Sequence, residues 1–395
     1  MTPAARIAAA AAILDQVLAG SSAEQTLTAW ARKSRFAGSG DRAAVRDFVF
    51  DALRRKRSLA WLGGAETGRG LMLGALRAVG QDPIAYFTGG KHDLPPLSAT
   101  ESAAPDPIDH APDPVRHDVQ DWLWPLVGDA LGDTSQANLT ALQSRAPVFL
   151  RVNTAKTTPA EAIAELRTDE IIAIPSSLSP SALVVTGNPR RIKNSSAYRT
   201  GLVELQDAAS QAVVDVIVPY ARSKSVLDYC AGGGGKALHL AASGAARVVA
   251  HDANPDRMRD IPVRAVRGGH KISVSQSPKG QFDCVLLDVP CSGSGAWRRQ
   301  PEAKWRLTPE RLAELNGIQD EILQEAVKHV SEDGVLAYVT CSFLRPENDE
   351  RIDAFCARHP EFETVERRQF TPLDGGDGFF VVVLKRRGLP FSSSV

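Results

Sequence analysis

The sequence lacks the features that define disulfide-rich, zinc-binding and membrane proteins. Its 395 residues include five cysteines, an odd number with no CxxC spacing, so neither a disulfide framework nor a zinc site is expected. No uninterrupted apolar run approaches the ~18 residues of a membrane-spanning helix, and no ligand cluster predicts a metal. We therefore expect a protein of the reducing cytoplasm, with no metal, no membrane partner and no obligate protein partner.

The chain as a whole has no net charge, but its charges are unevenly placed. Basic and acidic side chains number 46 each. Residues 1–91 carry 13 basic and 7 acidic side chains, whereas residues 92–121 carry 1 basic and 7 acidic side chains. A basic module followed by an acidic spacer is typical of nucleic-acid enzymes, although solvated helix faces explain the same pattern.

The first half of the chain divides by composition. Apolar residues at helical spacing predict a helical domain over 1–91, with one helix at 41–62 whose polar face carries the basic run 54–57. Residues 92–121 hold six prolines among Ser, Thr, Asp and Glu, so they are predicted to be an acidic linker without a core of its own. Residues 122–205 are predicted to be a small α+β subdomain.

Strands and helices alternate over residues 206–395. The expected strands lie at 226–229, 247–251, 271–274, 284–287, 335–339 and 379–384, and the expected helices at 237–242, 309–330 and 347–358. This alternation predicts the fold class α/β, with a doubly wound, mostly parallel, Rossmann-like sheet.

A glycine loop follows the first of these strands. Residues 225–236 read SVLDYCAGGGGK, and Asp252 follows the next strand. Glycines let a ligand approach the backbone, and a carboxylate in this position can accept hydrogen bonds from ribose hydroxyls. The spacing matches neither GxGxxG nor a P-loop, so an adenosyl site of the S-adenosylmethionine type is favoured over a nicotinamide or ATP site. A plain strand–helix turn is the alternative.

Two cysteine motifs follow two later strands. The strand at 284–287 leads into Asp288-Val-Pro-Cys291, and the strand at 335–339 leads into Thr340-Cys341. We expect these strand ends to lie side by side, so that two thiols and one carboxylate meet in one pocket. Cys284 and Cys356 are expected to be small buried apolar residues.

Two thiols and a carboxyl group suit the methylation of a pyrimidine at carbon 5. A thiolate that adds to carbon 6 makes carbon 5 nucleophilic, and the sulfur can later leave. A carboxyl group can protonate or hydrogen-bond ring nitrogen 3. A base must finally remove the proton of carbon 5, and the second cysteine is a candidate for that step.

On these motifs the sequence resembles the Sun (RsmB/Nop) family of RNA 5-methylcytosine methyltransferases, over roughly residues 120–390. The basic helices of residues 1–91 resemble the NusB-like RNA-binding domain of the RsmB branch. The matching segments are Leu150-Arg-Val-Asn-Thr154, Gln206-Asp-Ala-Ala-Ser-Gln211, the glycine loop, Asp288-Val-Pro-Cys291 and Thr340-Cys341-Ser342.

The resemblance assigns a role to each site residue. It implies that Cys341 is the nucleophile, that Cys291 assists release, and that Asp288 contacts the cytosine. It further implies that Asp252 holds the ribose of S-adenosylmethionine and that Lys236 reaches into the active site. The loop residues implied to wrap the cofactor, together with Lys236 and Asp288, are Cys230, Ala231, Gly232, Gly233, Gly234 and Gly235. The implied partner is RNA, ribosomal RNA above all.

Departures from the family pattern keep other functions open. Gly233 stands where the family often has proline, Ala237 replaces a hydroxyl residue, and the segment after the third strand, 273–277, has no acidic residue near the expected adenine. An RNA-binding ribosome assembly factor with a degenerate cofactor site is therefore one alternative. Another is a DNA cytosine methyltransferase in which Cys291 attacks, although Glu347-Asn348-Asp349 is a poor match to the motif expected there.

Basic and aromatic runs are candidates for holding RNA. They are residues 54–57, residues 190–193, and the segment 297–306, which contains Trp297, Arg298, Arg299, Lys304, Trp305 and Arg306. Single-stranded RNA is held by basic grooves and by stacking on aromatic side chains. Because the last segment follows Cys291, we expect it to border the base pocket, although a core tryptophan with solvated neighbours is the alternative.

Overall fold

The computed structural model describes residues 1–387 and divides the chain into two compact units. The helical unit holds residues 1–145 together with residues 297–306. The sheet unit holds residues 146–296 and the described chain from residue 307 onward. The chain therefore enters the helical unit twice. The predicted division into four consecutive segments does not include this second passage.

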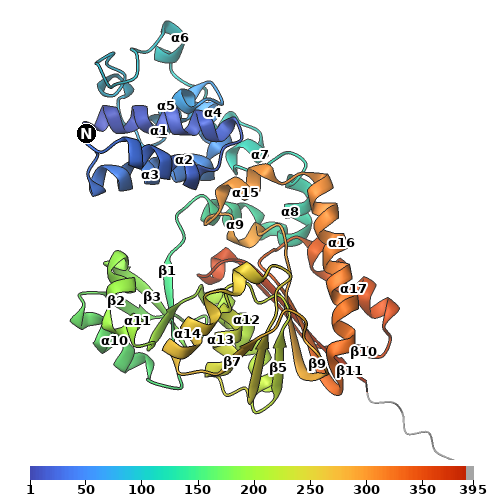
Figure 1. Cartoon of the computed structure of the whole chain (residues 1–395). Helices are drawn as coiled ribbons and strands as arrows, with labels where there is room; N and C mark the ends of the chain where they lie inside the picture. Colours follow the sequence, from blue (N-terminus) through green and yellow to red (C-terminus); the bar gives the residue numbers. More distant parts are fainter. Residues whose placement is uncertain (388–395) are drawn as a thin grey trace, which may run out of the picture. The chain divides into compact units, whose positions relative to one another are not determined.

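Five helices form the body of the helical unit (Figure 1): α1 Pro3–Leu18, α2 Ala23–Lys33, α3 Ser39–Arg54, α4 Lys56–Gly63 and α5 Gly68–Ala78. Their apolar faces share one core cluster, which includes Ile7, Leu14, Val49, Leu53, Leu71 and Met72. Gly74 lets α5 approach α4, since a Cβ there would lie 2.0 Å from the Leu59 carbonyl oxygen. The helix predicted at 41–62 is two helices, because the backbone leaves helical geometry at Arg55.

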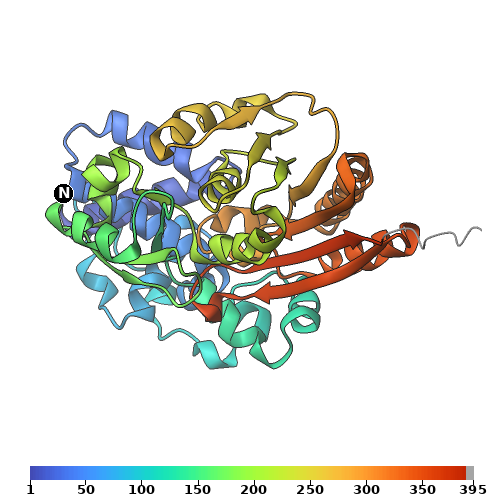
Figure 2. The same ribbon diagram turned by 90° about the horizontal axis from the view of Figure 1, so that it is seen from below.

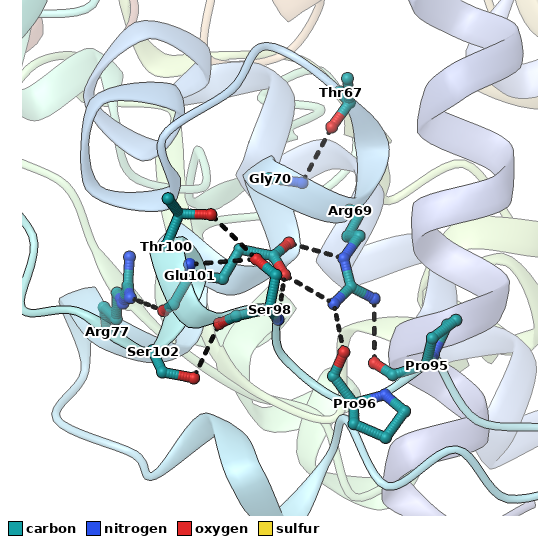
Figure 3. A network of polar contacts seen from close by, with 10 residues as sticks. All are labelled: Thr67, Arg69, Gly70, Arg77, Pro95, Pro96, Ser98, Thr100, Glu101 and Ser102. Carbon is teal, nitrogen blue, oxygen red and sulfur yellow. Dashed lines mark hydrogen bonds and ion pairs between the residues drawn. The ribbon is translucent and has the colours of Figure 1, made fainter.

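The proline-rich segment 92–121 is fixed within the helical unit by arginine side chains of α5 (Figure 3). It contains the short helices α6 Ala99–Ser102 and α7 Asp113–Arg116. Arg69 donates to the carbonyl oxygens of Pro95 and Pro96 at 3.0 and 3.1 Å, and to Glu101 at 2.7 Å. The hydrogen bonds from Arg69 lower the pKa of Glu101 to about 2. Composition predicts a linker here, but it does not reveal these bonds.

Residues 122–145 also belong to the helical unit, where they form α8 Trp124–Leu131 and α9 Ser135–Leu142. The α+β subdomain predicted from residue 122 therefore begins only after these two helices. The second pass of the chain adds α15 Pro301–Arg306. Its Lys304 ammonium donates to the Arg54 carbonyl oxygen at 3.0 Å, and the Trp305 indole donates to the Leu53 carbonyl oxygen at 2.6 Å.

The sheet unit begins with a four-stranded antiparallel sheet of order β2-β3-β1-β4. Its elements are β1 Val148–Val152, α10 Pro159–Thr168, β2 Ile172–Pro175, β3 Ala182–Gly187, α11 Ser196–Arg199 and β4 Val203–Leu205. The sequence predicts strands at 149–153 and 183–186 and a helix at 160–166, and these correspond to β1, β3 and α10. The two outer strands, β2 and β4, were not predicted, because β2 is largely exposed and β4 has three residues.

The second sheet has seven strands in the order β10-β11-β9-β8-β5-β6-β7 (Figure 2). The strands are β5 Ser225–Asp228, β6 Arg247–Ala250, β7 Ile272–Val274, β8 Phe282–Asp288, β9 Val330–Thr340, β10 Phe362–Phe370 and β11 Phe379–Arg386. The pairings from β9 through β7 are parallel, whereas β11 pairs antiparallel with both of its neighbours, β10 and β9. The predicted α/β class with a mostly parallel, doubly wound sheet is confirmed.

Helices cover both faces of this sheet (Figures 1 and 2). They are α12 Ala208–Ala221, α13 Gly235–Ala242, α14 Ile261–Gly268, α16 Pro309–Ala326 and α17 Asp349–Arg358. Apolar side chains of α12, α13 and α14 share one cluster with the sheet, and those of α16 and α17 share another. No helix within residues 1–387 is long and apolar enough to cross a membrane.

Buried polar side chains join the two sheets within the sheet unit. Arg151 of β1 donates to the Gly235 carbonyl oxygen at 2.8 Å and also bonds Gln206. Gln211 of α12 donates to the Leu150 carbonyl oxygen at 3.2 Å. Asn153 donates to the Gly268 carbonyl oxygen at 2.8 Å. The motifs at 150–154 and 206–211 therefore connect the four-stranded sheet to the glycine loop, to α12 and to α14.

We predict that Arg69→Ala loosens the segment 95–103 without unfolding α5. The substitution removes the bonds to Pro95, Pro96 and Glu101, which are worth roughly 1–2 kcal/mol together. Hydrogen exchange measured by mass spectrometry should show roughly tenfold faster exchange of amides in 98–103. Arg35→Ala, at an exposed position, is the matched control and should leave exchange unchanged; equal rates in both variants would contradict this account.

Candidate active site

The glycine loop connects β5 to α13 and adopts a conformation that needs glycine. Gly232 and Gly234 have φ values of +50° and +80°, in the left-handed region that glycine adopts easily. A Cβ at Gly234 would lie 2.7 Å from Cγ1 of Ile261. The loop is closed by a 2.8 Å bond from the Gly234 amide to the Ala231 carbonyl oxygen. The chain therefore comes to a tight backbone turn directly after β5.

Asp252 lies beside this loop, as the sequence predicts. It is buried at 4% exposure. Its Oδ2 accepts from the Gly232 amide at 2.9 Å and from Arg257 at 3.0 Å, and its Oδ1 accepts from the Asn254 amide at 2.9 Å. A carboxylate offers about four acceptor positions, so these donors leave room for one more. The Arg257 side chain is 60% exposed, so it can move aside and free a second acceptor position of the carboxylate.

The two motif cysteines meet at the carboxyl ends of neighbouring strands. Because β8 pairs with β9 in parallel, with Asp288 opposite Val339, the loops that follow both strands leave the sheet together. The Sγ atoms of Cys291 and Cys341 lie 3.4 Å apart. The hydrogen bond with Cys341, followed by burial, raises the pKa of Cys291 well above its usual value. Cys291 therefore keeps its proton at neutral pH.

Lys236 and Asp288 form an ion pair at the same edge of the sheet. Lys236 Nζ donates to Asp288 Oδ2 at 2.6 Å, and it lies 5.1 Å from the ring centre of Phe379. Burial would lower the pKa of Lys236, but Asp288 and, more weakly, Cys341 raise it above its usual value. The ammonium group is therefore charged, and its positive charge lies near both Asp288 and the cysteine pair.

One buried carboxyl group was missed by the sequence reasoning. Asp228 ends β5 directly before the glycine loop, and its exposure is 1%. Among residues 1–387 its Oδ1 atom has no hydrogen-bond partner. Burial, and next the charge of Asp288, raise the pKa of Asp228 to about 7. An acidic residue immediately before a glycine loop is the signal that could have identified it.

The other predicted residues of the loop have backbone roles in this structure. The Ala231 amide donates to the His251 carbonyl oxygen at 2.8 Å. The Gly233 carbonyl accepts from Arg264, and the Gly235 carbonyl accepts from Arg151. Burial raises the pKa of Cys230, so this thiol is protonated and unreactive. Cys284 is fully buried with a pKa raised by burial to about 12, in agreement with its expected role as a small apolar residue.

The segment after β7 has no replacement for the missing acidic residue. The Ser275 amide continues the sheet by donating to the Ala250 carbonyl oxygen at 2.9 Å. The Ser275 carbonyl lies 3.0 Å from Nδ1 of His251, and its hydroxyl accepts from the Ser277 amide at 3.3 Å. Serine hydroxyls, the exposed amide side chain of Gln276 and backbone groups are thus the polar groups of this segment.

The structure corrects part of the predicted RNA surface. Trp297, Arg298 and Lys304 are buried at 1%, 5% and 3% exposure in the helical unit. Burial lowers the pKa of Lys304 to about 8. These side chains cannot stack on or bind RNA while they are buried, so the prediction that they hold RNA is wrong. The alternative of a core tryptophan is confirmed for Trp297, but Arg298 and Lys304 are buried and not solvated.

The run 54–57 is also engaged in contacts within the helical unit. Arg54 is buried and donates to the Arg298 carbonyl oxygen at 2.7 Å, and Arg57 donates to the Val119 carbonyl oxygen at 2.7 Å. By contrast, the basic side chains of the run 190–193 in the sheet unit are exposed.

Comparisons with known proteins agree with this arrangement. A family model described as 16S rRNA methyltransferase RsmB/F matches residues 216–387, and one described as Methyltr_RsmF/B-like, ferredoxin-like domain matches residues 120–191. Ribosomal RNA small subunit methyltransferase B of Yersinia enterocolitica is 31% identical over 284 residues, which cover 67% of this chain and 66% of the relative. The protein of the same name from Yersinia pseudotuberculosis is 32% identical over 277 residues, 66% of this chain and 64% of that protein. The chain thus spans slightly less than two thirds of these relatives.

Solved structures share the fold. The crystal structure of PH0851 superposes with a TM-score of 0.77 at 22% identity and covers 98% of this chain and 99% of that one. NSun6 from Pyrococcus horikoshii, solved with SFG, has a TM-score of 0.59 at 17% identity and covers 68% of this chain and 98% of that one.

The seven-stranded sheet with a glycine loop after its first parallel strand defines a Rossmann-like methyltransferase fold. Within that class, the chain belongs to the RsmB/F family of methyltransferases, on the evidence of residues 216–387 and of its relatives.

We predict that Asp228→Asn removes a pH-dependent loss of stability. Asp228 has a raised pKa in the folded protein, about 7. Its carboxyl group therefore does not destabilise the fold below about pH 4, and it destabilises the fold progressively as the pH rises to about 7. The difference in free energy of unfolding, variant minus wild type, should rise over this window by on the order of 2–4 kcal/mol.

Asp283→Asn is the control for this prediction. Hydrogen bonds from Ser225 lower the pKa of Asp283, so that group titrates below the window. Urea unfolding of the wild type and of both variants between pH 4 and pH 8 gives the difference in free energy of unfolding for each variant as a function of pH. A difference for Asp228→Asn that stays flat with pH would contradict the assignment.

Proposed function

We propose that the chain methylates carbon 5 of a cytosine in RNA, with S-adenosylmethionine as methyl donor and ribosomal RNA as the substrate class. The observation that carries the proposal is the 3.4 Å separation of the Cys291 and Cys341 sulfur atoms beside the Lys236–Asp288 pair. The names of the relatives, which are ribosomal RNA methyltransferases, support RNA as the substrate.

The cofactor would be held by the glycine loop and the carboxylates around it. The positive φ values at Gly232 and Gly234 keep the loop free of side chains where a ligand approaches. Asp252 would accept hydrogen bonds from the ribose hydroxyls, in place of Arg257. The unpartnered oxygen of Asp228 would face the positively charged part of the cofactor, which explains why a buried carboxylate is retained there.

The first chemical step is addition of a thiolate. Cys341 Sγ forms a bond to carbon 6, and the electrons of the ring double bond make carbon 5 nucleophilic. In this step Cys341 attacks as the thiolate, while Cys291, whose pKa is raised well above its usual value, keeps its proton and would donate a hydrogen bond to the Cys341 sulfur. Nitrogen 3 receives its proton from the Lys236–Asp288 pair, with Asp288 as the group that contacts the ring.

S-adenosylmethionine supplies an electrophilic methyl group to carbon 5 of the adduct. Once Cys341 is a thioether it no longer binds the Cys291 proton, so the largest cause of the raised pKa of Cys291 disappears. Cys291 then gives its own proton to solvent and, as a thiolate, takes the proton of carbon 5. The electrons of that C–H bond restore the ring double bond, the carbon–sulfur bond breaks, and nitrogen 3 returns its proton.

RNA would be held by the basic surfaces that stay exposed. Arg190, Arg191 and Lys193 follow β3 of the four-stranded sheet, and they are exposed. Together with the basic helices of residues 1–91, taken as a NusB-like RNA-binding domain, they would bind phosphates, and affinity should then fall with salt. The target cytosine must be unpaired or flipped to reach the strand ends.

A second candidate function is RNA binding in ribosome assembly without methyl transfer. The observation that favours it is the segment after β7, where the Ser275 hydroxyl and the Gln276 amide side chain stand in place of an acidic side chain. This function requires the same RNA surfaces but no use of the cysteine pair. A measurement of methyl incorporation into RNA therefore distinguishes the two candidate functions.

We predict opposite effects for the two cysteine variants. Cys341→Ala should abolish both methyl transfer, by about a thousandfold or more, and any covalent adduct, because no sulfur remains to attack carbon 6. Cys291→Ala should trap a protein–RNA adduct that resists denaturation, because no base removes the carbon 5 proton. The measurement is tritiated methyl incorporation into unmodified ribosomal RNA, with adducts separated on denaturing gels.

Cys356→Ala is the control variant, since this half-buried thiol lies on α17, away from the pair. It should retain activity and form no stable adduct. Exchanged phenotypes of the two variants would favour the DNA-type assignment, with Cys291 as nucleophile. RNA binding without methyl incorporation in the wild-type protein would favour the assembly function.

A further inference from the structure

A carboxylate is buried directly beneath the loop that carries Cys291. Glu347 lies in the short 3-10 helix η8 Arg345–Glu347, and its exposure is 0%. Its Oε1 atom accepts from the Ser292 amide at 2.7 Å and its Oε2 atom accepts from the Ser292 hydroxyl at 2.5 Å. Gln319 of α16 adds a weaker bond to Oε1 at 3.3 Å.

In the described part of the chain, the hydrogen-bond partners of the Glu347 side chain include no cation. Within residues 1–387 all its side-chain partners are hydrogen-bond donors, which suits a carboxylate, and none is a lysine or arginine. A buried charge without a counter-ion destabilises a fold, and a neutral residue of the same shape is often tolerated or stabilising. Folding therefore does not explain why a charge stands here.

The same contacts fix the positions of both sulfur atoms. Ser292 and Pro290 flank Cys291, and Gln319 donates to the Pro290 carbonyl oxygen at 2.9 Å. Beyond Ser292, the Gly295 amide donates to the Cys341 carbonyl oxygen at 3.0 Å. The Cys291 loop is thus held on each side, and one of its anchors is the Glu347 carboxylate.

The charges around Cys291 come from several elements. Cys341 follows β9, and the Lys236–Asp288 pair lies beside Cys341. Tyr338 of β9 is buried, and its hydroxyl donates to the Glu347 carbonyl oxygen at 2.6 Å. Of these groups, Glu347 places negative charge near Cys291. Lys236 is paired with Asp288, and Arg351, a cation that acts on Tyr338, is paired with Asp320 at 2.9 Å.

We propose that Glu347 is a positioning residue that holds Cys291 beside Cys341 and, by its negative charge, keeps the proton on Cys291 in the resting enzyme. The proposal deepens and rests on the proposed function. It gives the two thiols different roles: Cys341 is free to be the thiolate, while Cys291 remains the donor and later becomes a strong base. Without that charge the two thiols would compete for one proton.

The test separates charge from geometry with two variants. Glu347→Gln keeps the shape and an acceptor for the Ser292 amide but removes the charge. Ser292→Ala keeps the charge but removes the 2.5 Å bond from the hydroxyl. Both are made in the full chain, with and without Cys341→Ala, so that the proton of Cys291 can be followed with and without its sulfur partner.

The readout is the rate at which iodoacetamide alkylates Cys291 between pH 6 and pH 10, resolved by peptide mass spectrometry. In the Cys341→Ala background, adding Glu347→Gln should lower the pH midpoint of Cys291 alkylation by about one unit or more. Adding Ser292→Ala should not lower it. With Cys341 present, Glu347→Gln should also raise the share of alkylation found on Cys291 relative to Cys341 severalfold.

The proposal would be overturned if Glu347→Gln left the pH midpoint of Cys291 alkylation unchanged while its thermal unfolding stayed close to that of the Cys341→Ala protein. An equal fall in both variants would assign Glu347 a purely structural role and would overturn it as well. Neither result depends on RNA or methyl transfer. Failure of the proposed function would appear instead in the methylation and adduct assays, so the two failures are distinguishable.

Discussion

The parallel pairing of β8 with β9 is the constraint on which the active site depends. It aligns Asp288 with Val339, so the loops that carry Cys291 and Cys341 leave the sheet at the same edge. Neither loop could bring its sulfur to 3.4 Å from the other without that register. A shift of the register by one residue would also turn every side chain of β9 to the opposite face of the sheet. The apolar clusters on both faces therefore protect the geometry of the thiol pair.

The second constraint is the support of the glycine loop from outside the large sheet. The loop alone is a flexible turn, and its flexibility would be a disadvantage in a binding site. Arg151 reaches it from the four-stranded sheet, Asp252 binds it from the neighbouring strand, and Arg264 binds it from α14. Polar groups that are buried and satisfied in this way hold one conformation, since any other would leave them unpaired.

The sequence predicts the large sheet and the thiol pair well, because both follow from local patterns. Strand–helix alternation leaves few possible topologies, and in the one observed both cysteine motifs end adjacent strands. The charged strand β10 was missed, since residues such as Arg367 and Arg368 are typical of an exposed edge and not of a core strand. Glu347 was missed as a site residue because its importance lies in the groups that surround it, which no spacing encodes. Asp228 was missed although its position before the glycine loop is a usable signal.

The same limit explains the corrected RNA surface. A run of arginines, lysines and tryptophans reads as a nucleic-acid surface when its neighbours are unknown. In the structure Lys304 and Trp305 bond carbonyl oxygens of α3, and Trp297 is buried. Composition reports what a side chain can bind, and only the fold reports what it does bind. Likewise, the proline-rich segment 92–121 forms no core alone, yet Arg69 and Arg77 fix it.

The most direct test of the account is to identify the sulfur atom that becomes bonded to the base. RNA that contains 5-fluorocytidine allows addition and methyl transfer, but the fluorine at carbon 5 cannot be removed as a proton, so the adduct remains. Peptide mapping of the wild-type protein after reaction with this RNA and S-adenosylmethionine should locate the nucleotide on Cys341. An adduct on Cys291, or methyl transfer with no adduct on either cysteine, would contradict the account.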